Sequence, residues 1–421
     1  MISQDVFSVV HSTQTNPQFS DKRIKPSPTM KIQILNNIAS EGLAVFPSHY
    51  QVGTKIDNPD GLLVRSASID TELFPSLFAI SRAGAGVNNI TVDKATNQGI
   101  CVFNTPGANA NAVAELVFIM LGAYARNIHL GLRFFQNLTD LDDAGLNKEV
   151  EQKKSQFKGF ELAGKTLGVI GLGQIGVRVA NGGASREMKV IGFDPYPALA
   201  NIHTLSPNVS LARSMRELLQ EADIISLHVP LNPKTEGLVN QSFLEHLKAD
   251  AVLINFARGP IVVNRDVLNA LDSNKLRFYL TDFPSTTLLN HPKVICTPHL
   301  GASTEESEEH CSVMAATQLK NYLELGSITH SVNFPTAESI PKDTIACRLI
   351  MINQDIPGMI GFATQVIGRH NINISSYINE SNGQIGYNII DLETSPPQDL
   401  IKEIESNKDV IRTRSIFFHS Q

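Results

Sequence analysis

Three polar side chains that could act on a small bound anion each follow an apolar run of the sequence. Arg258, Asp282 and His299 come directly after three such runs, in that order along the chain. In an open parallel sheet the carboxyl ends of the strands line the ligand crevice, so we expect the three side chains to converge there. An arginine fork can bind a carboxylate through two donors, and an imidazole exchanges a proton near neutral pH. The pattern predicts proton transfer at an anion that an arginine holds, although a structural histidine or a domain-bridging arginine would give the same spacing.

A glycine-rich stretch, Gly171-Leu-Gly-Gln-Ile-Gly176, supplies the site for a second ligand. It follows the apolar run Thr166–Ile170 and opens a segment with helical character. In a strand–turn–helix unit, Gly171 allows a tight turn, Gly173 lets a pyrophosphate approach the backbone and Gly176 lets the helix pack on the strand. Asp194 ends the next predicted strand, where a carboxylate accepts hydrogen bonds from both ribose hydroxyls and repels a 2′-phosphate. The motif therefore predicts NAD rather than NADP.

The elements that must position these residues alternate between strands and helices. The nucleotide unit has predicted strands near 166–170, 189–193, 223–228, 251–255, 277–282 and 293–297. This series is typical of a doubly wound parallel sheet, the Rossmann α/β fold. Before it, strands near 61–65, 78–82 and 100–106 predict a smaller parallel sheet of flavodoxin-like type. An apolar helix from about Ala112 to Arg126 is expected to lead the chain into the nucleotide unit.

The last part of the chain predicts a unit with the order βαββαβ. Its strands lie near 345–352, 372–379, 385–392 and 409–418. Asn382-Gly383 favours a type I′ hairpin turn between the two middle strands. Upstream, Ser303-Thr-Glu-Glu306 has the form of a capping box and predicts a helix that runs to about Leu325.

These elements give a prediction of the domain organisation. The predicted parts are a tail at 1–29, a discontinuous substrate domain at 30–126 and 300–330, a nucleotide domain at 127–299, a linker at 331–342 and a regulatory domain at 343–421.

Composition excludes some classes of partner. The 421 residues carry a net charge of −6, so no global positive field would attract nucleic acid, and anions must be gripped by local arginines. The cysteines, Cys101, Cys296, Cys311 and Cys347, lack metal-ligand spacing, so we expect reduced thiols, a cytoplasmic location and no metal. The longest apolar stretch, Ala112 to Ala125, contains Glu115 and is too short for a membrane span, so no membrane contact is expected.

Taken together, the motifs resemble those of the D-2-hydroxyacid dehydrogenases, in particular the branch that acts on 3-phosphoglycerate and carries a C-terminal ACT domain. The resemblance covers residues 30–421. It rests on Gly171-Leu-Gly-Gln-Ile-Gly176, Phe256-Ala-Arg-Gly259, Thr297-Pro-His-Leu-Gly301, Gly84-Ala-Gly-Val-Asn-Asn-Ile90 and Asn104-Thr-Pro-Gly107.

The resemblance implies a role for each matching position. Arg258 and His299 would be catalytic, with His299 as the general base for the C2 hydroxyl of the substrate. The cofactor would contact Gly171, Gly173, Gln174, Ile175, Gly176, Asp194, Phe256, Ala257, Asp282 and Gly301, with Asp282 at the nicotinamide carboxamide. The substrate and its phosphate would contact Arg65, Ser66, Arg82, Asn88 and Arg258.

One departure from the family pattern concerns His299. Most members have a glutamate between the arginine and the histidine that orients the imidazole, but here the stretch reads Thr281-Asp-Phe-Pro-Ser285. No glutamate occurs between Arg258 and His299. Either another carboxylate orients His299 or the histidine works unpaired.

The ACT-like unit implies an amino-acid effector, such as serine, bound between chains. The positions that match serine contacts in related enzymes are Asn353, Asp355 and Asn373, of which only Asn373 keeps the residue type of the family. An ACT unit that serves assembly alone is the alternative.

The expected function is NAD-dependent oxidation of 3-phosphoglycerate, the first step of L-serine synthesis, by a homodimer or homotetramer. A dehydrogenase of another small 2-hydroxy acid and an NADH-sensing binding protein are the alternatives.

Overall fold

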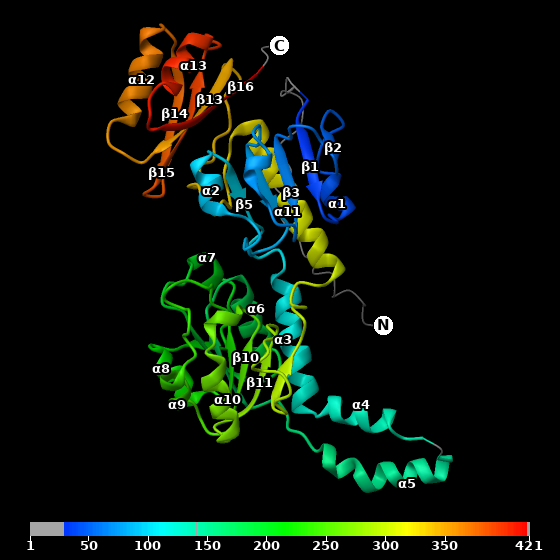
Figure 1. Cartoon of the computed structure of the whole chain (residues 1–421). Helices are drawn as coiled ribbons and strands as arrows, with labels where there is room; N and C mark the ends of the chain where they lie inside the picture. The colour runs from blue at the N-terminus through cyan, green and yellow to red at the C-terminus, as the bar shows by residue number, and fades with distance from the viewer. Residues whose placement is uncertain (1–28, 140, 419–421) are drawn as a thin grey trace, which may run out of the picture.

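The computed structural model describes residues 29–139 and 141–418, and within them the chain forms three sheets (Figure 1). Residues 1–28 of the predicted tail lie outside the described part. The two parallel sheets follow one another along the long direction of the molecule, and the antiparallel sheet lies beyond the first of them (Figure 1).

The first sheet has the strand order β2-β1-β3-β4-β5, and all of its strands are parallel. This is the flavodoxin-like order that the alternating pattern predicted. Its strands are β1 (Lys31–Leu35), β2 (Gln51–Gly53), β3 (Gly61–Val64), β4 (Ala79–Arg82) and β5 (Cys101–Phe103). Its local helices are α1 (Ser40–Leu43), η1 (Thr71–Leu73) and α2 (Val92–Asn97). Every residue of β3 is buried, as expected for a parallel strand that is covered on both faces.

One face of this sheet is covered by α11 (Glu305–Leu325), a helix that comes from the far end of the sequence. The buried hydroxyl of Ser81, on β4, donates to the carbonyl of Ala315 at 2.8 Å. Leu319 and Ile32 would both lie 3.0 Å from a Cβ added at Gly61. The helix and the strands that end at the predicted anion site therefore form one packed unit.

The second sheet has the order β12-β11-β10-β9-β6-β7-β8, which is the Rossmann order with one added strand. Its strands are β6 (Thr166–Ile170), β7 (Lys189–Phe193), β8 (Val209–Leu211), β9 (Ile224–Leu227), β10 (Ala251–Asn255), β11 (Leu276–Thr281) and β12 (Val294–Cys296). The flanking helices are α6 (Gln174–Ala184), α7 (Leu199–Ile202), α8 (Met215–Glu221), α9 (Gln241–Glu245), η3 (Gly259–Ile261) and α10 (Asn264–Asp272). The predicted fold class is confirmed.

Helix α3 (Ala110–Ala125) leaves the first sheet and packs against α6. Its apolar residues Val117 and Leu121 are fully buried in one cluster with Leu167 of β6. The first and second sheets are thus joined through α3 in one direction and through the segment before α11 in the other (Figure 1).

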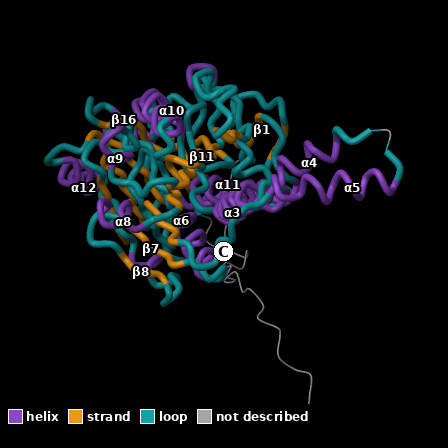
Figure 2. Tube along the Cα trace, turned by 90° about the horizontal axis from the view of Figure 1, so that it is seen from below, coloured by secondary structure: helices purple, strands orange, loops and turns teal. Residues whose placement is uncertain are grey.

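An arm of two helices, α4 (Ile128–Gln136) and α5 (Asp143–Lys153), projects from the nucleotide unit in both views (Figures 1 and 2). A 3₁₀ turn, η2 (Lys154–Phe157), brings the chain back, and Phe157 packs on Phe134 of α4 with ring centroids 5.3 Å apart. Among the described residues, no single helix is long and apolar enough to cross a membrane. Helices α3 and α4 pass that length and composition test only as a pair, bent by 64°.

The third sheet is antiparallel, with the order β14-β15-β13-β16, and the chain order is βαββαβ as predicted. Its elements are β13 (Cys347–Gln354), α12 (Met359–Arg369), β14 (Ile374–Ser381), β15 (Ile385–Leu392), α13 (Gln398–Glu405) and β16 (Val410–Phe417). The predicted type I′ turn is wrong, because Gly383 has φ +87° but Asn382 does not have a positive φ. The Asn382 side chain instead accepts from the backbone amides of Gln384 and Ile385, which closes a longer loop.

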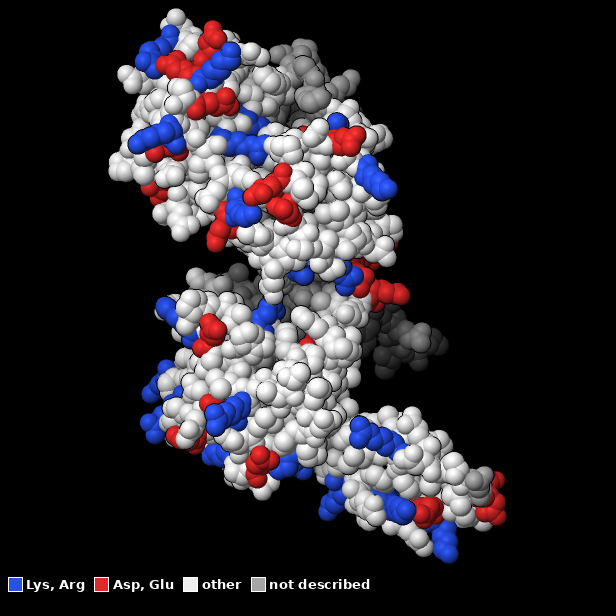
Figure 3. All heavy atoms as spheres, viewed as in Figure 1, with Lys and Arg blue, Asp and Glu red and all other residues white. Residues whose placement is uncertain are grey.

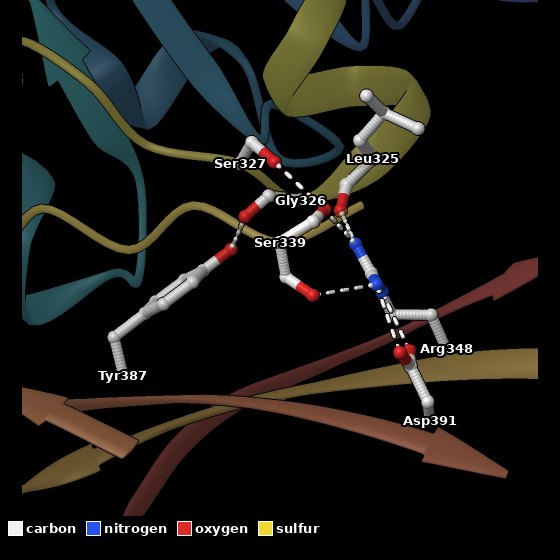
Figure 4. Close-up of polar contacts among 7 residues, drawn as sticks. All are labelled: Leu325, Gly326, Ser327, Ser339, Arg348, Tyr387 and Asp391. Atoms are coloured by element: carbon white, nitrogen blue, oxygen red, sulfur yellow. Dashed lines mark hydrogen bonds and ion pairs between the residues drawn. The ribbon is translucent and has the colours of Figure 1, made fainter. Parts of the chain in front are cut away.

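The two faces of this third sheet pack on different partners. Leu349 and Ile390 lie against α12 and α13, whereas Ile350 and Tyr387 share one buried cluster with Tyr322 of α11. Polar contacts reinforce the second interface (Figure 4). Arg348 pairs with Asp391 across the strands at 2.7 Å and donates to the carbonyls of Leu325 and Ser339. The Tyr387 hydroxyl donates to the Gly326 carbonyl at 2.7 Å. The sheet is therefore fixed to the C-terminal end of α11.

Candidate active site

The glycine-rich loop has the backbone geometry that the motif predicts. Gly171 has φ +92°, and a Cβ added there would lie 2.5 Å from the His228 carbonyl oxygen. A Cβ at Gly176 would lie 1.8 Å from the Gly171 carbonyl oxygen. Gly173 is the N-cap of α6, and nothing lies within 4 Å of a Cβ built on it. The first and third glycines are thus needed for packing, and the second leaves open space at a helix N-terminus, where a pyrophosphate fits.

Asp194 stands at the end of β7 and braces this loop. Its carboxylate accepts from the amides of Leu172 and Tyr196, each at 2.8 Å. Each oxygen accepts one of these bonds, so each retains a lone pair for a ribose hydroxyl. Gln174 is exposed and Ile175 half-buried at the start of α6, so both remain next to the open space. The donor set fits a dinucleotide.

Arg258 follows β10, and the preceding residues fix its position. Asn255 is fully buried, and its amide group donates to the Arg258 carbonyl at 2.9 Å and accepts from the Ala257 amide at 3.1 Å. Phe256 and Ala257 are buried, and the Arg258 guanidinium donates to the Ala257 carbonyl at 2.6 Å. Sequence reasoning missed Asn255, whose signal is a polar residue at the end of an otherwise apolar buried strand.

His299 lies in the loop after β12, and Asp282 organises that loop. Asp282 is 1% exposed, and its carboxylate accepts from the Thr297 hydroxyl at 2.6 Å and from the amides of Leu300 and Gly301, both at 2.7 Å. His299 has φ +60°, a region that residues other than glycine seldom adopt. The hydrogen bonds on both sides of His299 hold it there, so Asp282 positions the histidine through the backbone.

The His299 ring is exposed and packs edge-on against Phe283, with ring centroids 5.1 Å apart. Within residues 29–139 and 141–418, no hydrogen bond or ion pair reaches this ring. The family glutamate therefore has no replacement in direct contact with the imidazole in the described part of the chain.

Three arginines from two domains surround the Gly84–Gly86 turn. Arg82 donates through Nε to the Arg65 carbonyl at 2.9 Å and through a terminal nitrogen to the Gly86 carbonyl at 2.5 Å. A Cβ added at Gly86 would lie 3.4 Å from Arg258, which comes from the nucleotide domain. Burial lowers the pKa of Arg258, and burial together with the neighbouring Arg258 lowers the pKa of Arg82. This concentration of positive charge fits an anionic ligand.

The remaining predicted substrate residues lie around the same turn. Ser66 and Asn88 are exposed. The sequence analysis did not single out Asn36, whose side chain accepts from the amides of Ser66 and Ala67 at 3.0 and 2.7 Å. These contacts shape the loop that carries Arg65.

In the space-filling view, a notch separates the parts formed by the first and second sheets (Figure 3).

The predicted effector residues do not lie together within one chain. Asn353 is buried, and its side chain donates to the Gln354 carbonyl and accepts from Asn388. Asp355 is exposed and accepts from Ser381. Asn373 is exposed and precedes β14 at the opposite end of the sheet.

Strand pairing gives the distance between these two ends. Asn353 pairs with Gly386, whereas Ile374 and Cys347 both pair with Leu392. The six residue steps along β13 correspond to about 20 Å at about 3.4 Å per residue.

No group of three or more His, Cys, Asp or Glu side chains in the described ranges could hold a metal ion. All four cysteines are free thiols.

Comparison with known proteins identifies relatives of this site. The family model described as "D-isomer specific 2-hydroxyacid dehydrogenase, NAD binding domain" matches residues 128–301. A D-3-phosphoglycerate dehydrogenase of Methanocaldococcus jannaschii is 36% identical over 324 residues, which cover 75% of this chain and 59% of that protein. The enzyme of the same name from Haemophilus influenzae is 32% identical over 360 residues, which cover 82% of this chain and 83% of that protein.

A solved structure, the NAD⁺-bound 3-phosphoglycerate dehydrogenase of Entamoeba histolytica, is 27% identical and matches with a TM-score of 0.57. The match covers 73% of this chain and 99% of that one. The chain thus spans about three fifths of the M. jannaschii relative and most of the H. influenzae and E. histolytica proteins. On these matches, and with the glycine loop, Arg258 and His299 at the ends of neighbouring strands, the chain belongs to the D-isomer specific 2-hydroxyacid dehydrogenase family.

Proposed function

We propose that the chain oxidises 3-phosphoglycerate to 3-phosphohydroxypyruvate with NAD, the first step of L-serine synthesis. The observation that carries the proposal is the set of Arg65, Arg82 and Arg258 around one turn, in a chain that also has a dinucleotide loop. The substrate carries a carboxylate and a phosphate, and arginine forks are suited to both groups. The names of the relatives support the same substrate.

Each side chain then has a role that follows from its position. Arg258 would bind the substrate carboxylate and polarise the C2 oxygen, while Arg65 and Arg82 would bind the phosphate. His299 would take the proton of the C2 hydroxyl while the C2 hydrogen leaves as hydride and the carbonyl forms. NAD, when bound, supplies the hydride acceptor. Asp282 retains one lone pair beyond its three loop contacts, and this pair is available to the nicotinamide carboxamide.

Turnover assays with matched variants test this proposal. We expect NADH formation with 3-phosphoglycerate to exceed that with D-glycerate, D-lactate and glycolate. His299→Gln should lower kcat by about 10²- to 10⁴-fold, the usual contribution of a general base. His310→Gln, which changes an exposed histidine on α11, should leave kcat within twofold.

Two outcomes would contradict the proposal. Preference for an unphosphorylated hydroxy acid would favour a different dehydrogenase. Tight NADH binding without turnover of any hydroxy acid would favour an NADH-sensing protein.

We further propose that the C-terminal domain binds an amino acid, such as serine, between two chains. Asn353 and Asp355 lie about 20 Å from Asn373 along the sheet, so one site that uses all three needs a second copy of the domain. Serine at millimolar concentration should change activity or Tm in the wild type, and Asn373→Ala should reduce the response. If serine changes neither activity nor Tm, the effector proposal is contradicted and the domain serves assembly alone.

The arm of α4 and α5 supports self-association. Several large apolar side chains on it are exposed, namely Ile128, Leu130, Leu132, Phe135 and Leu141. The spacing of Ile128, Leu132 and Phe135 places them on one face of α4. An exposed apolar face favours a protein partner, and we propose a second copy of the chain. Leu132→Glu with Phe135→Glu should reduce the mass measured by sedimentation, whereas Asn147→Glu on α5 should not. An unchanged mass in the double variant would contradict this interface.

A cytoplasmic location is part of the same proposal, and the four free thiols support it.

A further inference from the structure

Arg65 differs from the other two arginines of the site because a carboxylate already occupies it. Its guanidinium lies 2.7 Å from Glu308, with the two side chains 34% and 43% exposed. No carboxylate in the described part of the chain lies within ion-pair distance of Arg82 or Arg258. One of the two guanidiniums that the proposed function assigns to the phosphate is therefore bound to an internal anion.

The ion pair lies within a single packed unit. Arg65 follows β3, and Glu308 stands in the first turns of α11, which packs on β3 and β4. The Ser81–Ala315 hydrogen bond and the contact of Leu319 with Gly61 fix that helix to the sheet. A movement of the nucleotide domain would leave Arg65 and Glu308 together, whereas an anion that binds Arg65 competes with Glu308 directly.

A phosphate group is the anion best able to do so. It carries close to two negative charges at neutral pH and offers a guanidinium several acceptor oxygens. A carboxylate left beside it would repel it, because like charges at hydrogen-bonding distance oppose each other. Binding of the phosphate on Arg65 thus requires Glu308 to turn away, which its exposure allows.

We propose that Glu308 competes with the substrate phosphate for Arg65 and thereby sets the affinity of the site for phosphorylated hydroxy acids. This inference rests on the proposed function. Glu308 acts through Arg65 and takes no part in the chemical step. An unphosphorylated hydroxy acid does not need Arg65, so its binding is independent of the competition.

The test compares Glu308→Gln with Glu309→Gln in the full chain. Glu309 is the next residue on the same helix and is exposed, so its change removes the same charge without touching Arg65. For Glu308→Gln we expect KM for 3-phosphoglycerate and the inhibition constant of inorganic phosphate to fall by about two- to fivefold, the factor expected for an exposed ion pair. The kcat value and KM for D-glycerate should stay within twofold, and Glu309→Gln should change neither phosphate constant.

A double-variant cycle tests whether the effect of Glu308→Gln acts through Arg65 or through a general change in structure. In an Arg65→Gln background, Glu308→Gln should no longer affect the binding of phosphate. The proposal is overturned if Glu308→Gln leaves the phosphate constants unchanged or raises them, or if the effect persists without Arg65.

The two proposals fail separately. If the wild type does not turn over 3-phosphoglycerate, the proposed function is wrong. The role of Glu308 is tested independently, because inorganic phosphate can be titrated into the wild type and Glu308→Gln without any turnover.

Discussion

His228 is a half-buried titratable residue next to the dinucleotide loop, and its ring nitrogen Nδ1 is buried. Its Nε2 lies 2.8 Å from the Ser226 hydroxyl, and its Nδ1 has no hydrogen-bond partner among the described residues. Its backbone carbonyl lies against Gly171, so the residue stands directly beside the glycine turn. Burial lowers the pKa of His228 to about 3, because the charged imidazolium would lose its hydration. The ring is therefore neutral throughout the range in which the protein is expected to work.

This depressed pKa predicts acid sensitivity. Above about pH 6.5, the pKa of an unfolded histidine, His228 is neutral in both the folded and the unfolded chain and does not lower the free energy of unfolding. As the pH falls toward 3, the unfolded histidine takes up a proton that the folded one does not, and stability is lost progressively. The free energy of unfolding should fall by about 1.4 kcal/mol more for the wild type than for His228→Gln between pH 7.5 and 5.5. Urea unfolding at both pH values measures the difference, and His310→Gln is the control. Equal pH dependence in the wild type and His228→Gln would show that His228 does not limit acid stability.

The sequence predicted the residues that end strands but not their supporting contacts. Arg258 and His299 stand where the strand pattern puts them, because the carboxyl ends of parallel strands meet at one edge. The Arg65–Glu308 pair and the contacts of Asp282 join segments that are far apart or irregular in the chain. No periodic pattern encodes such contacts, since they depend on how the helix and the loop pack.

At the scale of single elements, α11 begins one residue later than the sequence pattern indicated. The capping-box prediction at Ser303–Glu306 is wrong, because Thr304 is the N-cap and its hydroxyl accepts from the Ser307 amide at 3.1 Å. The Ser303 amide instead donates to the Leu300 carbonyl, within the loop that Asp282 holds. The loop that positions His299 thus decides where the helix starts.

A pair of alanine variants separates the two candidate caps. Thr304→Ala should lower the free energy of unfolding by about 1 kcal/mol, the usual loss for an N-cap hydroxyl. Ser303→Ala should change it by less than about 0.5 kcal/mol, as for an ordinary surface substitution. Urea denaturation gives both numbers, and a larger loss from Ser303→Ala would restore the pattern-based assignment.

At the scale of the whole molecule, α11 joins the site to the C-terminal domain. Its first residues follow the His299 loop and carry Glu308, and its last carbonyls accept from side chains of the third sheet (Figure 4). Arg414 donates to Tyr322 and Leu323, and Arg348 donates to Leu325. Cations at a helix C-terminus satisfy carbonyls that have no partner within the helix.

The sequence predicted the βαββαβ unit but not this docking. The sequence pattern predicts that each strand of the unit has an apolar face. It does not predict that α11 and the segment at 326–342 cover that face. Helix α11 thus connects the proposed effector domain with the elements that carry Arg65 and His299.

The buried ion pair of Arg348 and Asp391 joins two strands of the third sheet and holds the guanidinium that donates to the end of α11. Arg348 is fully buried and Asp391 nearly so, and Asp391 is its only carboxylate partner within the described ranges. Asp391→Asn would leave a buried guanidinium without a counter-charge, so the free energy of unfolding should fall by about 3–5 kcal/mol. Glu403→Gln, which weakens the partly exposed contacts of Glu403 with Arg369 and His370, should cost at most about 1 kcal/mol.

Urea unfolding compares these variants with the joint change Arg348→Met and Asp391→Leu. The joint change should recover most of the loss, because it removes both buried charges together. If the joint variant is stable and yet loses its response to serine, the Arg348 contacts with α11 transmit the serine response to the active site and contribute little to stability. If Asp391→Asn costs no more than Glu403→Gln, the apolar faces alone hold the third sheet on α11.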